Sequence, residues 1–315
     1  MVTKEYTFKR AFENKRAAVK EREVKRRMLL NSLYASNPRL AQIDLELKKT
    51  GAQMLIWDKA KILELKEQSQ KLVKEKQAIL EKAGIPKDMP DCTLCGDTGY
   101  INGKICECIK HEAAKIMAEE LSKEMPLKDC RFDNFDLNYY PDKTDGDGLN
   151  PKKRMTAVLK LCREYVMGFN GNSESLLFMG GVGLGKTHLT MSIVSGVIEK
   201  GFMPIYGSAE NLFAIVETEK FSGEGRGNYD AMLNCDLLVI DDLGAEMTTS
   251  FTKSVLYNLV NTRILKNIPT IINTNLSMKQ IEEKYSARIS SRLMSNYNVK
   301  KFLGGDIRQK KLLGN

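Results

Sequence analysis

The sequence predicts an α/β fold in which helices cover a parallel sheet, preceded by a helical N-terminal domain and a small metal-binding module. Three features of the 315 residues lead to this prediction. Short apolar runs alternate with stretches of helical spacing in the second half of the chain, as in parallel sheets covered on both faces. One of these runs leads into a glycine-rich phosphate-binding motif. Four cysteines lie within 17 residues upstream of that motif.

Residues 1–90 are expected to form a basic helical domain, since they contain almost no glycine. They hold 21 Lys and Arg against 12 Asp and Glu, whereas the remaining 225 residues hold 28 of each. All the excess positive charge is therefore in this domain, where it either contacts nucleic acid or an acidic protein surface or is solvated. Pro38 divides the domain into one basic helix and one longer helix after it.

The longer helix carries one apolar stripe at helical spacing. Such a stripe packs either against a hairpin partner within the same chain or against another protein, and the sequence leaves both open. The stripe consists of Leu40, Ile43, Leu47, Met54, Ile62, Leu65, Leu72 and Ile79.

A cysteine-rich module is predicted over residues 91–112. Four thiolates suit tetrahedral Zn²⁺ in a structural role, and the glycines between the two cysteine pairs permit the tight turns of a metal knuckle. His111 could replace one cysteine, an iron–sulfur cluster could use the same sulfurs, and free or redox-active thiols are a further alternative. The thiols follow the pattern Cys92-x₂-Cys95-x₁₀-Cys106-x-Cys108.

A connector over residues 113–150 leads into the nucleotide-binding domain, predicted over residues 151–315. Helices are expected at 153–168, 187–200 and 251–266. The expected strands are Leu176–Met179, Met203–Tyr206, Leu237–Asp241, Thr270–Asn273 and one near Val299–Leu303.

Composition also bounds where the protein acts. No segment approaches the roughly 18 consecutive apolar residues of a membrane helix, and the charged start of the chain does not match a secretory signal. Seven cysteines, an odd number, fit a reducing compartment better than a disulfide framework. We therefore expect a cytoplasmic protein with no membrane partner.

A complete P-loop lies between the first apolar run and a helix. Its glycines allow backbone N–H groups to close around phosphate oxygens, and the helix N-terminus favours the anion. Lys186 would reach the β- and γ-phosphates, and the Thr187 hydroxyl would hold Mg²⁺. The motif predicts binding of a nucleoside triphosphate. It reads Gly180, Gly181, Val182, Gly183, Leu184, Gly185, Lys186 and Thr187, followed by His188.

Polar residues follow two of the later strands. Asp241 and Asp242 end an apolar run 55 residues after Lys186, a Walker B pattern in which Asp241 would hold Mg²⁺ through water and Asp242 would orient the attacking water. Asn275 follows the next strand and could reach the same water, with Asn273 as the competing choice. A loop-capping amide is the alternative for either asparagine.

Arginines near the end of the chain are candidates for stabilising transition-state charge. Arg288 and Arg292 are four residues apart on one face of a predicted helix, and surface salt bridging is the alternative for each. Arg308 is a third candidate. Arg226, in the glycine-rich loop 223–227, could reach a DNA-binding channel or could lie in a solvated loop.

With these motifs in order, residues 92–315 resemble the bacterial replicative-helicase loaders of the DnaC/DnaI type, within the AAA+ ATPases, with the IstB-like transposition ATPases as near relatives. The motifs that carry the resemblance are Cys92–Tyr100, Arg131–Leu137, Gly185–Leu189, Ile240–Glu246, Thr274–Leu276 and Arg288–Leu293.

The resemblance implies roles for these residues. Lys186 and Thr187 would be Walker A, Asp241 and Asp242 Walker B, and Asn275 the sensor-1 residue of an ATP site. Arg292 falls at the arginine-finger position, donated to the ATP of a neighbouring subunit, and Arg308 looks like the sensor-2 arginine. The segment Arg131–Tyr140 looks like the lead-in that packs near the nucleotide base.

The implied function is an ATP-dependent loader, with a slow ATPase used as a switch. It would bind the replicative hexameric helicase through its N-terminal domain, self-associate through its ATP sites and deliver the helicase onto single-stranded DNA. Two departures bear on this. Many AAA+ proteins have Glu where Asp242 stands, which affects the hydrolysis rate. The chain also ends seven residues after Arg308, without room for a four-helix lid, a truncation that the loaders share.

Two other functions compete with the loader. An IstB-like ATPase would assist a transposase by remodelling duplex DNA, and the cysteine cluster argues against it. A pure interaction module with a degenerate ATPase site is disfavoured by the intact Lys186, Thr187 and Asp241.

Overall fold

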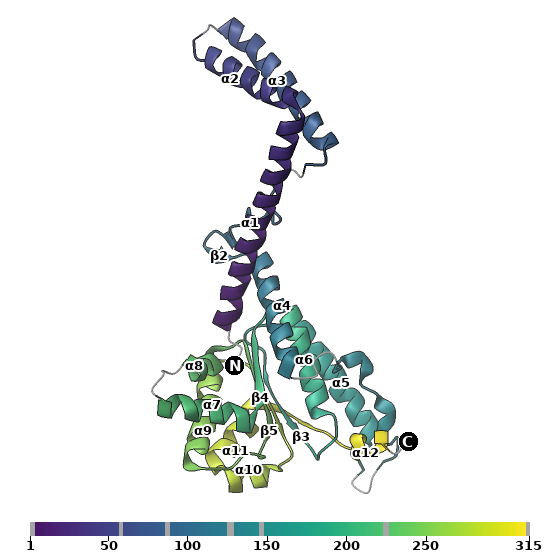
Figure 1. The fold of residues 1–315 in the computed structure, drawn as a ribbon. Helices are drawn as coiled ribbons and strands as arrows, with labels where there is room; N and C mark the ends of the chain where they lie inside the picture. Colours follow the sequence, from purple (N-terminus) through teal and green to yellow (C-terminus); the bar gives the residue numbers. More distant parts are fainter. Residues whose placement is uncertain are drawn as a thin grey trace. The chain divides into compact units, whose positions relative to one another are not determined.

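The computed structural model describes residues 4–56, 59–85, 89–124, 129–144, 148–222 and 227–312. The chain forms two compact units (Figure 1). The N-terminal unit is Phe12–Cys108, and the sheet unit combines Met1–Ala11 with Ile109–Asn315. In the part of the chain that is described, no helix has both the length and the apolar character needed to cross a membrane.

The sheet unit is built on five parallel strands in the order β4-β5-β6-β3-β7. The five predicted strands are confirmed, each within a few residues. They read as nearly continuous apolar runs because helices cover both faces of the sheet. The strands are β3 (Ser175–Met179), β4 (Pro204–Ser208), β5 (Leu237–Leu243), β6 (Thr270–Thr274) and β7 (Tyr297–Lys301).

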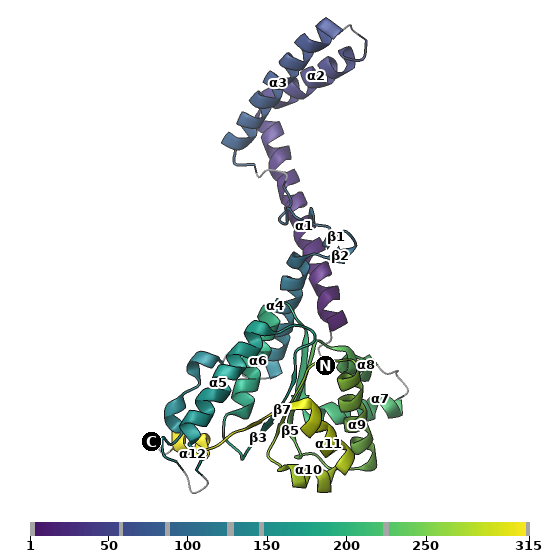
Figure 2. The same cartoon turned by 180° about the vertical axis from the view of Figure 1, so that it is seen from behind.

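Helices cover the sheet on both sides, with α5 and α6 on one face and α7, α9 and α11 on the other (Figures 1 and 2). The three helices predicted here are confirmed as α5, α6 and α9. The helices of this unit are α4 (Glu107–Glu124), α5 (Pro151–Gly168), α6 (Lys186–Glu199), α7 (Ala209–Ser222), α8 (Gly227–Asn234), α9 (Ser250–Leu265), α10 (Met278–Lys284), α11 (Ala287–Asn296) and α12 (Ile307–Leu312), with 3₁₀ turns at Phe132–Asn134 and Leu137–Tyr139.

The strand order determines which residues meet at the edge where the parallel strands end. Strand β6 lies between β3, which leads into the P-loop, and β5, which carries the two aspartates near its end. All carboxyl ends of the parallel strands lie at the same edge of the sheet. The asparagines at the end of β6 are therefore placed between Lys186 and Asp241.

A fully buried arginine joins the elements at the opposite edge. Arg263 donates to the carbonyl oxygens of Pro269 (2.6 Å), Met232 (2.7 Å) and Cys235 (3.1 Å), and to the Thr270 hydroxyl (2.9 Å). These acceptors come from the end of α8 and from the segments that enter β5 and β6. The guanidinium thus fixes α9 to both strand entries.

Replacing Arg263 by methionine is expected to lower the free energy of unfolding by about 3 kcal/mol, because several buried carbonyl groups would lose their donor. Chemical denaturation followed by circular dichroism measures this. Arg163→Met is the matched control, since Arg163 is half exposed and pairs with the exposed Asp133, and it should change stability by about 0.5 kcal/mol or less. Equal losses in the two variants would contradict the prediction.

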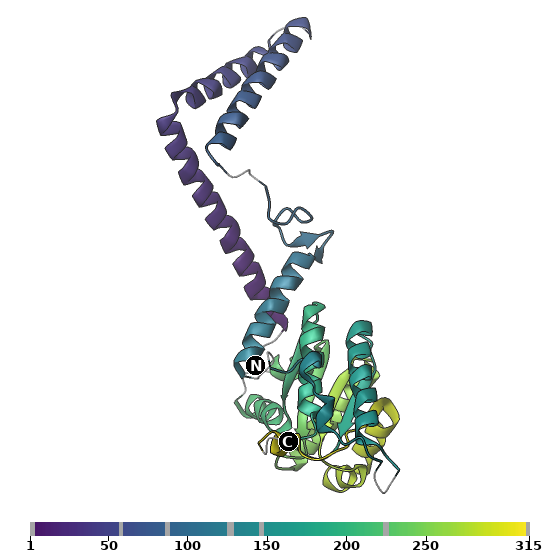
Figure 3. The ribbon, with the colours of Figure 1, turned by 90° about the vertical axis from the view of Figure 1, so that its right-hand side faces the viewer.

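The N-terminal unit contains α1 (Lys4–Ser36, from Phe12 onward), α2 (Pro38–Gln53), α3 (Lys59–Lys82) and the short hairpin of β1 (Tyr100–Ile101) and β2 (Lys104–Ile105). The prediction of one longer helix after Pro38 was wrong. The chain instead turns after Gln53, where the N–H groups of Leu55 and Ile56 bond carbonyls three residues back. Helices α2 and α3 lie side by side as an antiparallel hairpin (Figure 3).

The apolar stripe explains why the chain turns. Leu40, Ile43, Leu65 and Leu72 are buried between α2 and α3, so each half of the stripe covers the other. Polar contacts flank this seam, including the paired bonds from Arg39 to Glu75 (2.7 and 2.8 Å), Lys76 to Asp44 (2.5 Å) and Ser69 to Thr50 (3.1 Å). Of the two alternatives for the stripe, the hairpin partner is confirmed.

Candidate functional site

The P-loop connects β3 to α6 and is shaped by glycines. Gly183 and Gly185 have φ angles of 72° and 85°, in the left-handed region that favours glycine. A Cβ on Gly183 would lie 1.9 Å from Asp306 Oδ1, and one on Gly185 would lie 2.7 Å from Phe135 Cε2. Both positions therefore need glycine for backbone conformation and for close packing.

Lys186 is the first residue of α6, and its side chain is 6% exposed. The ammonium donates to the carbonyl oxygens of Gly180 and Gly181 (2.7 Å each) and to Asn275 Oδ1 (2.6 Å). Burial lowers the pKa of Lys186, against the opposing charges of Asp242 and Asp241. The cation is thus held over the loop by neutral oxygens at the edge of the sheet.

Asp241 lies at the end of β5 and is buried. Its carboxylate accepts from Thr187 Oγ1 (3.0 Å), from Asn273 Nδ2 (2.7 Å) and from the Tyr206 hydroxyl. Burial, together with the charge of Asp241, raises the pKa of Tyr206. A hydroxyl and a carboxylate side by side match the protein groups that hold Mg²⁺ in P-loop sites.

The two asparagines near the end of β6 make different contacts. Asn273 is fully buried and orients Asp241, with its own amide oxygen accepting from Thr190 (3.0 Å). Asn275 is exposed at the open edge, where it contacts Lys186. The sequence left the choice between them open, and the structure brings Asn275 to Lys186.

Asp242 lies at the open edge, beside the buried Asp241. Its φ of 50° is left-handed, and the pairing of β5 with β6 shifts register at this point. Burial and the charge of Asp241 raise the pKa of the Asp242 carboxyl, while the charges of Lys186 and Arg308 oppose this. The structure therefore brings together Lys186, Thr187, Asp241, Asp242, Asn275 and Arg308 of the predicted site residues.

The predicted lead-in segment packs against the outside of the P-loop. The Tyr140 hydroxyl donates to the carbonyl of Leu184 (2.9 Å), and the Phe135 ring stacks on Tyr140 with centroids 5.7 Å apart. His188 meets Phe135 edge-on at 5.3 Å and contacts the Arg131 carbonyl through Nε2 (2.9 Å). His188 thus fastens this segment to α6.

The segment after β7 holds the P-loop from another direction. The N–H of Phe302 donates to the Met179 carbonyl (2.7 Å), and that of Ile307 donates to the Gly183 carbonyl (3.0 Å). Lys310 then reaches the Tyr139 carbonyl (2.6 Å) and joins this segment to the lead-in. Arg308 lies on this segment, at the start of α12.

Arg292 lies elsewhere in the sheet unit. Its guanidinium lies over the Tyr257 ring (4.7 Å to the centroid) and donates to Asn261 Oδ1 (2.8 Å), both on α9. The contacts recorded for the described residues do not bring Arg292 or Arg288 to the P-loop of the same chain. The predicted loop arginine, Arg226, lies outside the described residues.

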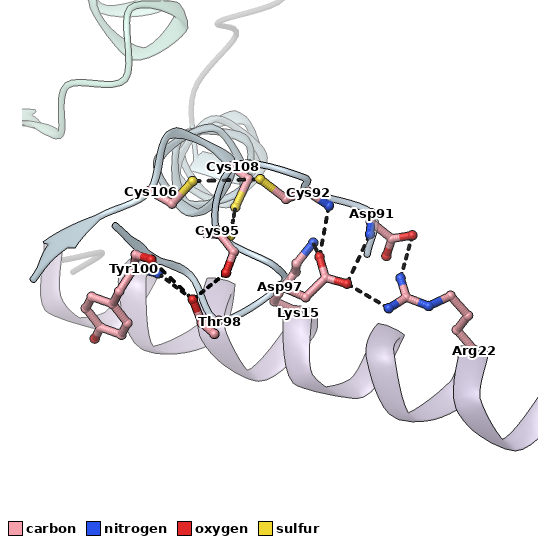
Figure 4. Close-up of polar contacts among 10 residues, drawn as sticks. All are labelled: Lys15, Arg22, Asp91, Cys92, Cys95, Asp97, Thr98, Tyr100, Cys106 and Cys108. Atoms are coloured by element: carbon pink, nitrogen blue, oxygen red, sulfur yellow. Dashed lines mark hydrogen bonds and ion pairs between the residues drawn. The ribbon is translucent and has the colours of Figure 1, made fainter. Parts of the chain in front are cut away.

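The four clustered cysteines form a second candidate site, in the N-terminal unit (Figure 4). The Sγ atoms of Cys92 and Cys106 are 3.8 Å apart, those of Cys95 and Cys108 are 3.6 Å apart, and all four lie within 4.8 Å of one another. Tetrahedral Zn²⁺ with bonds of about 2.3 Å separates its sulfurs by about 3.8 Å. The residues therefore fit a four-thiolate metal site.

Local backbone geometry brings the cysteines together. The turn between β1 and β2 is Asn102-Gly103, both with positive φ, as in a tight hairpin turn. The N–H of Cys106 donates to the Gly99 carbonyl (2.8 Å), which closes the knuckle. Hydrogen bonds to the Cys92 sulfur, of which the one from the Cys95 backbone N–H has the largest effect, lower the pKa of Cys92 to about 7. The thiolate, the form that binds metals, is therefore accessible at neutral pH.

An aspartate next to the cluster binds helix α1, which the sequence did not reveal. Asp97 pairs with Lys15 and Arg22 of α1 (2.7 Å each) and accepts the N–H of Cys92 (2.9 Å), as Figure 4 shows. Burial alone would raise the pKa of Asp97, but hydrogen bonds from both cations hold it well below its usual range. Part of the basic charge of α1 is therefore used to hold the knuckle. The only available signal was the spacing of Lys15 and Arg22, seven residues apart on one helix face.

Replacing Asp97 by alanine is expected to weaken metal binding by about 10- to 100-fold, because it removes the acceptor that orients the Cys92 backbone and both cations of α1. Titration with a competing chelator measures this affinity. Asp91→Ala is the matched control, since Asp91 pairs with Arg22 but its side chain is mostly exposed. Its metal affinity should stay within about threefold of the wild type, and an equal loss in both variants would contradict the role of Asp97.

Comparisons with known proteins find relatives of this chain. The family model described as IstB-like ATP binding protein matches residues 154–295. The "Replicative helicase loader DnaC" of Escherichia coli (strain K12) is 28% identical over 168 residues, 53% of this chain and 63% of that protein. The chain thus spans less than two thirds of that relative. The protein of the same name from Buchnera aphidicola subsp. Baizongia pistaciae is 24% identical, over 59% and 72% of the two chains.

Among solved structures, the one titled "Crystal structure of the DnaC helicase loader" is 20% identical, with a TM-score of 0.48 over 56% of this chain and 99% of that one. The family match spans α5 to α11, which include the P-loop, the paired aspartates and the asparagines of β6. The chain therefore carries an IstB/DnaC-like AAA+ domain.

Proposed function

We propose that this chain is an ATP-dependent loader that binds a replicative hexameric helicase and delivers it onto single-stranded DNA. The observation that carries the proposal is the combination of an intact P-loop and aspartate pair with relatives named as replicative helicase loaders. A loader of this kind would act in the cytoplasm.

The geometry supports ATP hydrolysis. Lys186 can exchange its carbonyl contacts for β- and γ-phosphate oxygens, and Thr187 with Asp241 can hold Mg²⁺. The raised pKa of Asp242 brings this carboxylate closer to the basicity needed to accept a proton from the attacking water. Asp242 is one methylene shorter than glutamate, which favours slow turnover suited to a switch.

Arg292 supports self-association through the ATP sites. Its side chain is fixed on α9 by Tyr257 and Asn261 rather than at the P-loop of its own chain. A guanidinium in that position is available to the γ-phosphate of a neighbouring subunit, where it would stabilise transition-state charge. ATP would then bridge adjacent subunits of a ring or spiral.

The N-terminal unit is the proposed helicase grip. Leu55 and Ile56, at the turn between α2 and α3, are 89% and 82% exposed, although the apolar stripe of the hairpin is buried. Two neighbouring exposed apolar residues at the end of a hairpin can anchor a protein partner.

An aromatic and cationic cluster supports the proposed contact with single-stranded DNA. Phe221 is exposed at the end of α7, and its ring lies 6.5 Å from Phe251 of α9. The Lys220 ammonium lies 4.8 Å from the centre of the Phe251 ring. Bases stack on such rings without sequence preference, while lysine meets the phosphate backbone.

Full-length protein should therefore form a stable complex with the cognate hexameric helicase, detected by size exclusion and pull-down with and without ATP. Leu55→Asp with Ile56→Asp should abolish the complex, whereas Met167→Asp, at an apolar position on α5 that is 72% exposed, should leave it intact. Equal helicase binding by both variants would contradict the proposal that the hairpin turn at Leu55 and Ile56 contacts the helicase.

The IstB-like family match also favours a second candidate, an ATPase that assists a transposase by remodelling duplex DNA. If the wild-type chain does not bind the helicase but assembles on duplex DNA with ATP and bends it, this candidate replaces the loader.

A further inference from the structure

The turn after β5 is bound to the end of α10 by buried and partly buried hydrogen bonds. Glu246 accepts from the Tyr285 hydroxyl with one carboxylate oxygen and from the Gly244 N–H (2.9 Å) with the other. Lys284 donates to the Gly244 carbonyl (2.5 Å), and the Ala245 N–H donates to the Asp242 carbonyl (3.0 Å). The turn that begins at Asp242 is therefore fixed by side chains from α10 and the residue after it. Helices α10 and α11 pack against each other (Figure 2).

The Glu246–Tyr285 pair places a carboxylate and a hydroxyl in the protein interior. Glu246 is 4% exposed and Tyr285 is 3% exposed. A buried carboxylate is unfavourable unless its hydrogen bonds are satisfied. Gly244 has a φ of 109°, and a Cβ there would lie 2.6 Å from Leu276 Cδ1, so the turn leaves no room for a side chain. The contacts thus specify one conformation of the segment that carries Asp242.

The turn is also connected to the P-loop lysine. At the end of β6, the Thr274 hydroxyl donates to the carbonyl of Leu243, the last residue of β5 (2.6 Å). The next residue, Asn275, accepts from Lys186 (2.6 Å). Two hydrogen bonds, joined by the peptide link between Thr274 and Asn275, therefore connect Lys186 to the turn that Glu246 holds.

On its other side, Tyr285 adjoins the helix that carries the arginines. Tyr285 is the C-cap of α10, and Ser286 is the N-cap of α11, where its hydroxyl accepts from the Ile289 N–H (3.3 Å). Arg288 and Arg292 lie within the first two turns of α11. A movement of Tyr285 would therefore change the position of the α11 N-terminus.

We infer that Glu246 and Tyr285 are positioning residues of the ATPase, which join the Asp242 turn of one site to the arginine helix offered to a neighbouring subunit. The inference rests on the proposed function, since it requires subunits that share ATP sites. Binding of ATP at Lys186 and presentation of Arg292 to the neighbour are then linked within one chain by this buried pair.

We call the Glu246–Tyr285 pair the bridge. Mixtures of two variant chains test separately its connection to the ATP site and its connection to the arginine helix. Lys186→Ala chains cannot use their own site but keep the arginine helix, and Arg292→Ala chains keep the site but lack the arginine. A mixture of the two should hydrolyse ATP at the hybrid interface. Adding Tyr285→Phe to either chain should lower that rate by about fivefold or more, whereas ATP affinity of the Arg292→Ala chain should stay within about twofold.

Two further variants separate the bridge from general destabilisation. Tyr165→Phe removes another buried tyrosine hydroxyl bond, to the Glu174 carbonyl (2.9 Å), at the start of β3 and away from the site, and it should leave the hybrid rate unchanged. Glu246→Gln should retain most activity because an amide can pair with both Tyr285 and Gly244, whereas Glu246→Ala should behave like Tyr285→Phe. A loss from only one side of the interface, or an equal loss in Tyr165→Phe, would overturn the bridge.

A second readout is independent of hydrolysis. Hydrogen exchange of residues 287–296 should change in the full-length wild type when a non-hydrolysable ATP analogue binds, and that change should be absent in Tyr285→Phe. An unresponsive wild-type helix, or an unaltered response in the variant, would overturn the inference. If the wild type responds but the mixed chains show no hydrolysis, the link between the ATP site and α11 within one chain stands, and the proposed shared ATP site fails together with the role of Arg292 in it.

Discussion

Replacing Lys186 by alanine should weaken ATP binding by about 100-fold, which corresponds to about 3 kcal/mol of charge-assisted hydrogen bonding. The lysine is the buried cation of the site, and its contacts are neutral oxygens that phosphate can replace. A fluorescent ATP analogue and isothermal titration calorimetry measure the loss.

The matched control for this variant is Lys200→Ala, at the other end of α6. Lys200 donates to three carbonyl oxygens at the end of α5, those of Val166, Met167 and Phe169, and so serves the fold. That variant should lower the melting temperature while keeping nucleotide affinity within about twofold. ATP affinity in Lys186→Ala within threefold of the wild type would show that the loop binds phosphate by its backbone alone.

The four-thiolate site predicts about one bound metal ion per chain, and replacing Cys106 by serine should reduce this content to none. Cys106 is fully buried in the knuckle, and structural metal sites commonly contribute about 10–16 kcal/mol to folding of the segments that hold them. Elemental analysis measures the ion. Hydrogen exchange should show loss of protection around residues 91–108, while the sheet unit keeps its protection.

Cys162→Ser provides the comparison for that experiment. Cys162 is fully buried on α5, outside the cluster, and burial raises the pKa of its thiol to about 12. The variant should bind the same amount of metal as the wild type. Retention of metal by Cys106→Ser would assign the site to other ligands, and elemental analysis would also distinguish zinc from iron.

The strands and the grouping of polar residues around the P-loop could be predicted because each motif is local in the sequence. The apolar runs mark buried parallel strands, and the spacing from Lys186 to Asp241 places both residues at the carboxyl edge of one sheet. Arg308 and Arg131–Tyr140 could be placed near the loop only by resemblance, because long-range packing brings them there. Tyr206 was missed, although it ends a predicted strand, because nothing local indicates that its hydroxyl meets Asp241.

The N-terminal domain shows a different limit. A stripe of period 3.6 continues across residues 54–58, so periodicity alone could not distinguish one long helix from two packed helices. The charge count was likewise ambiguous, because it does not show that Lys15, Arg22, Arg39 and Lys76 pair within the domain. Glu246 and Tyr285 are 39 residues apart and leave no local signature.

The phosphate loop is held in place by its protein surroundings. The segment after β7 bonds the loop at Gly183, the lead-in bonds it at Leu184, and Lys310 connects the two. In flexible loops, conformational entropy is lost when the ligand binds. In this protein the loop is already ordered, so that entropy is lost when the chain folds. Nucleotide affinity should then depend mainly on the enthalpy of exchanging the Lys186 carbonyl contacts for phosphate oxygens, and little on the entropy of ordering the loop.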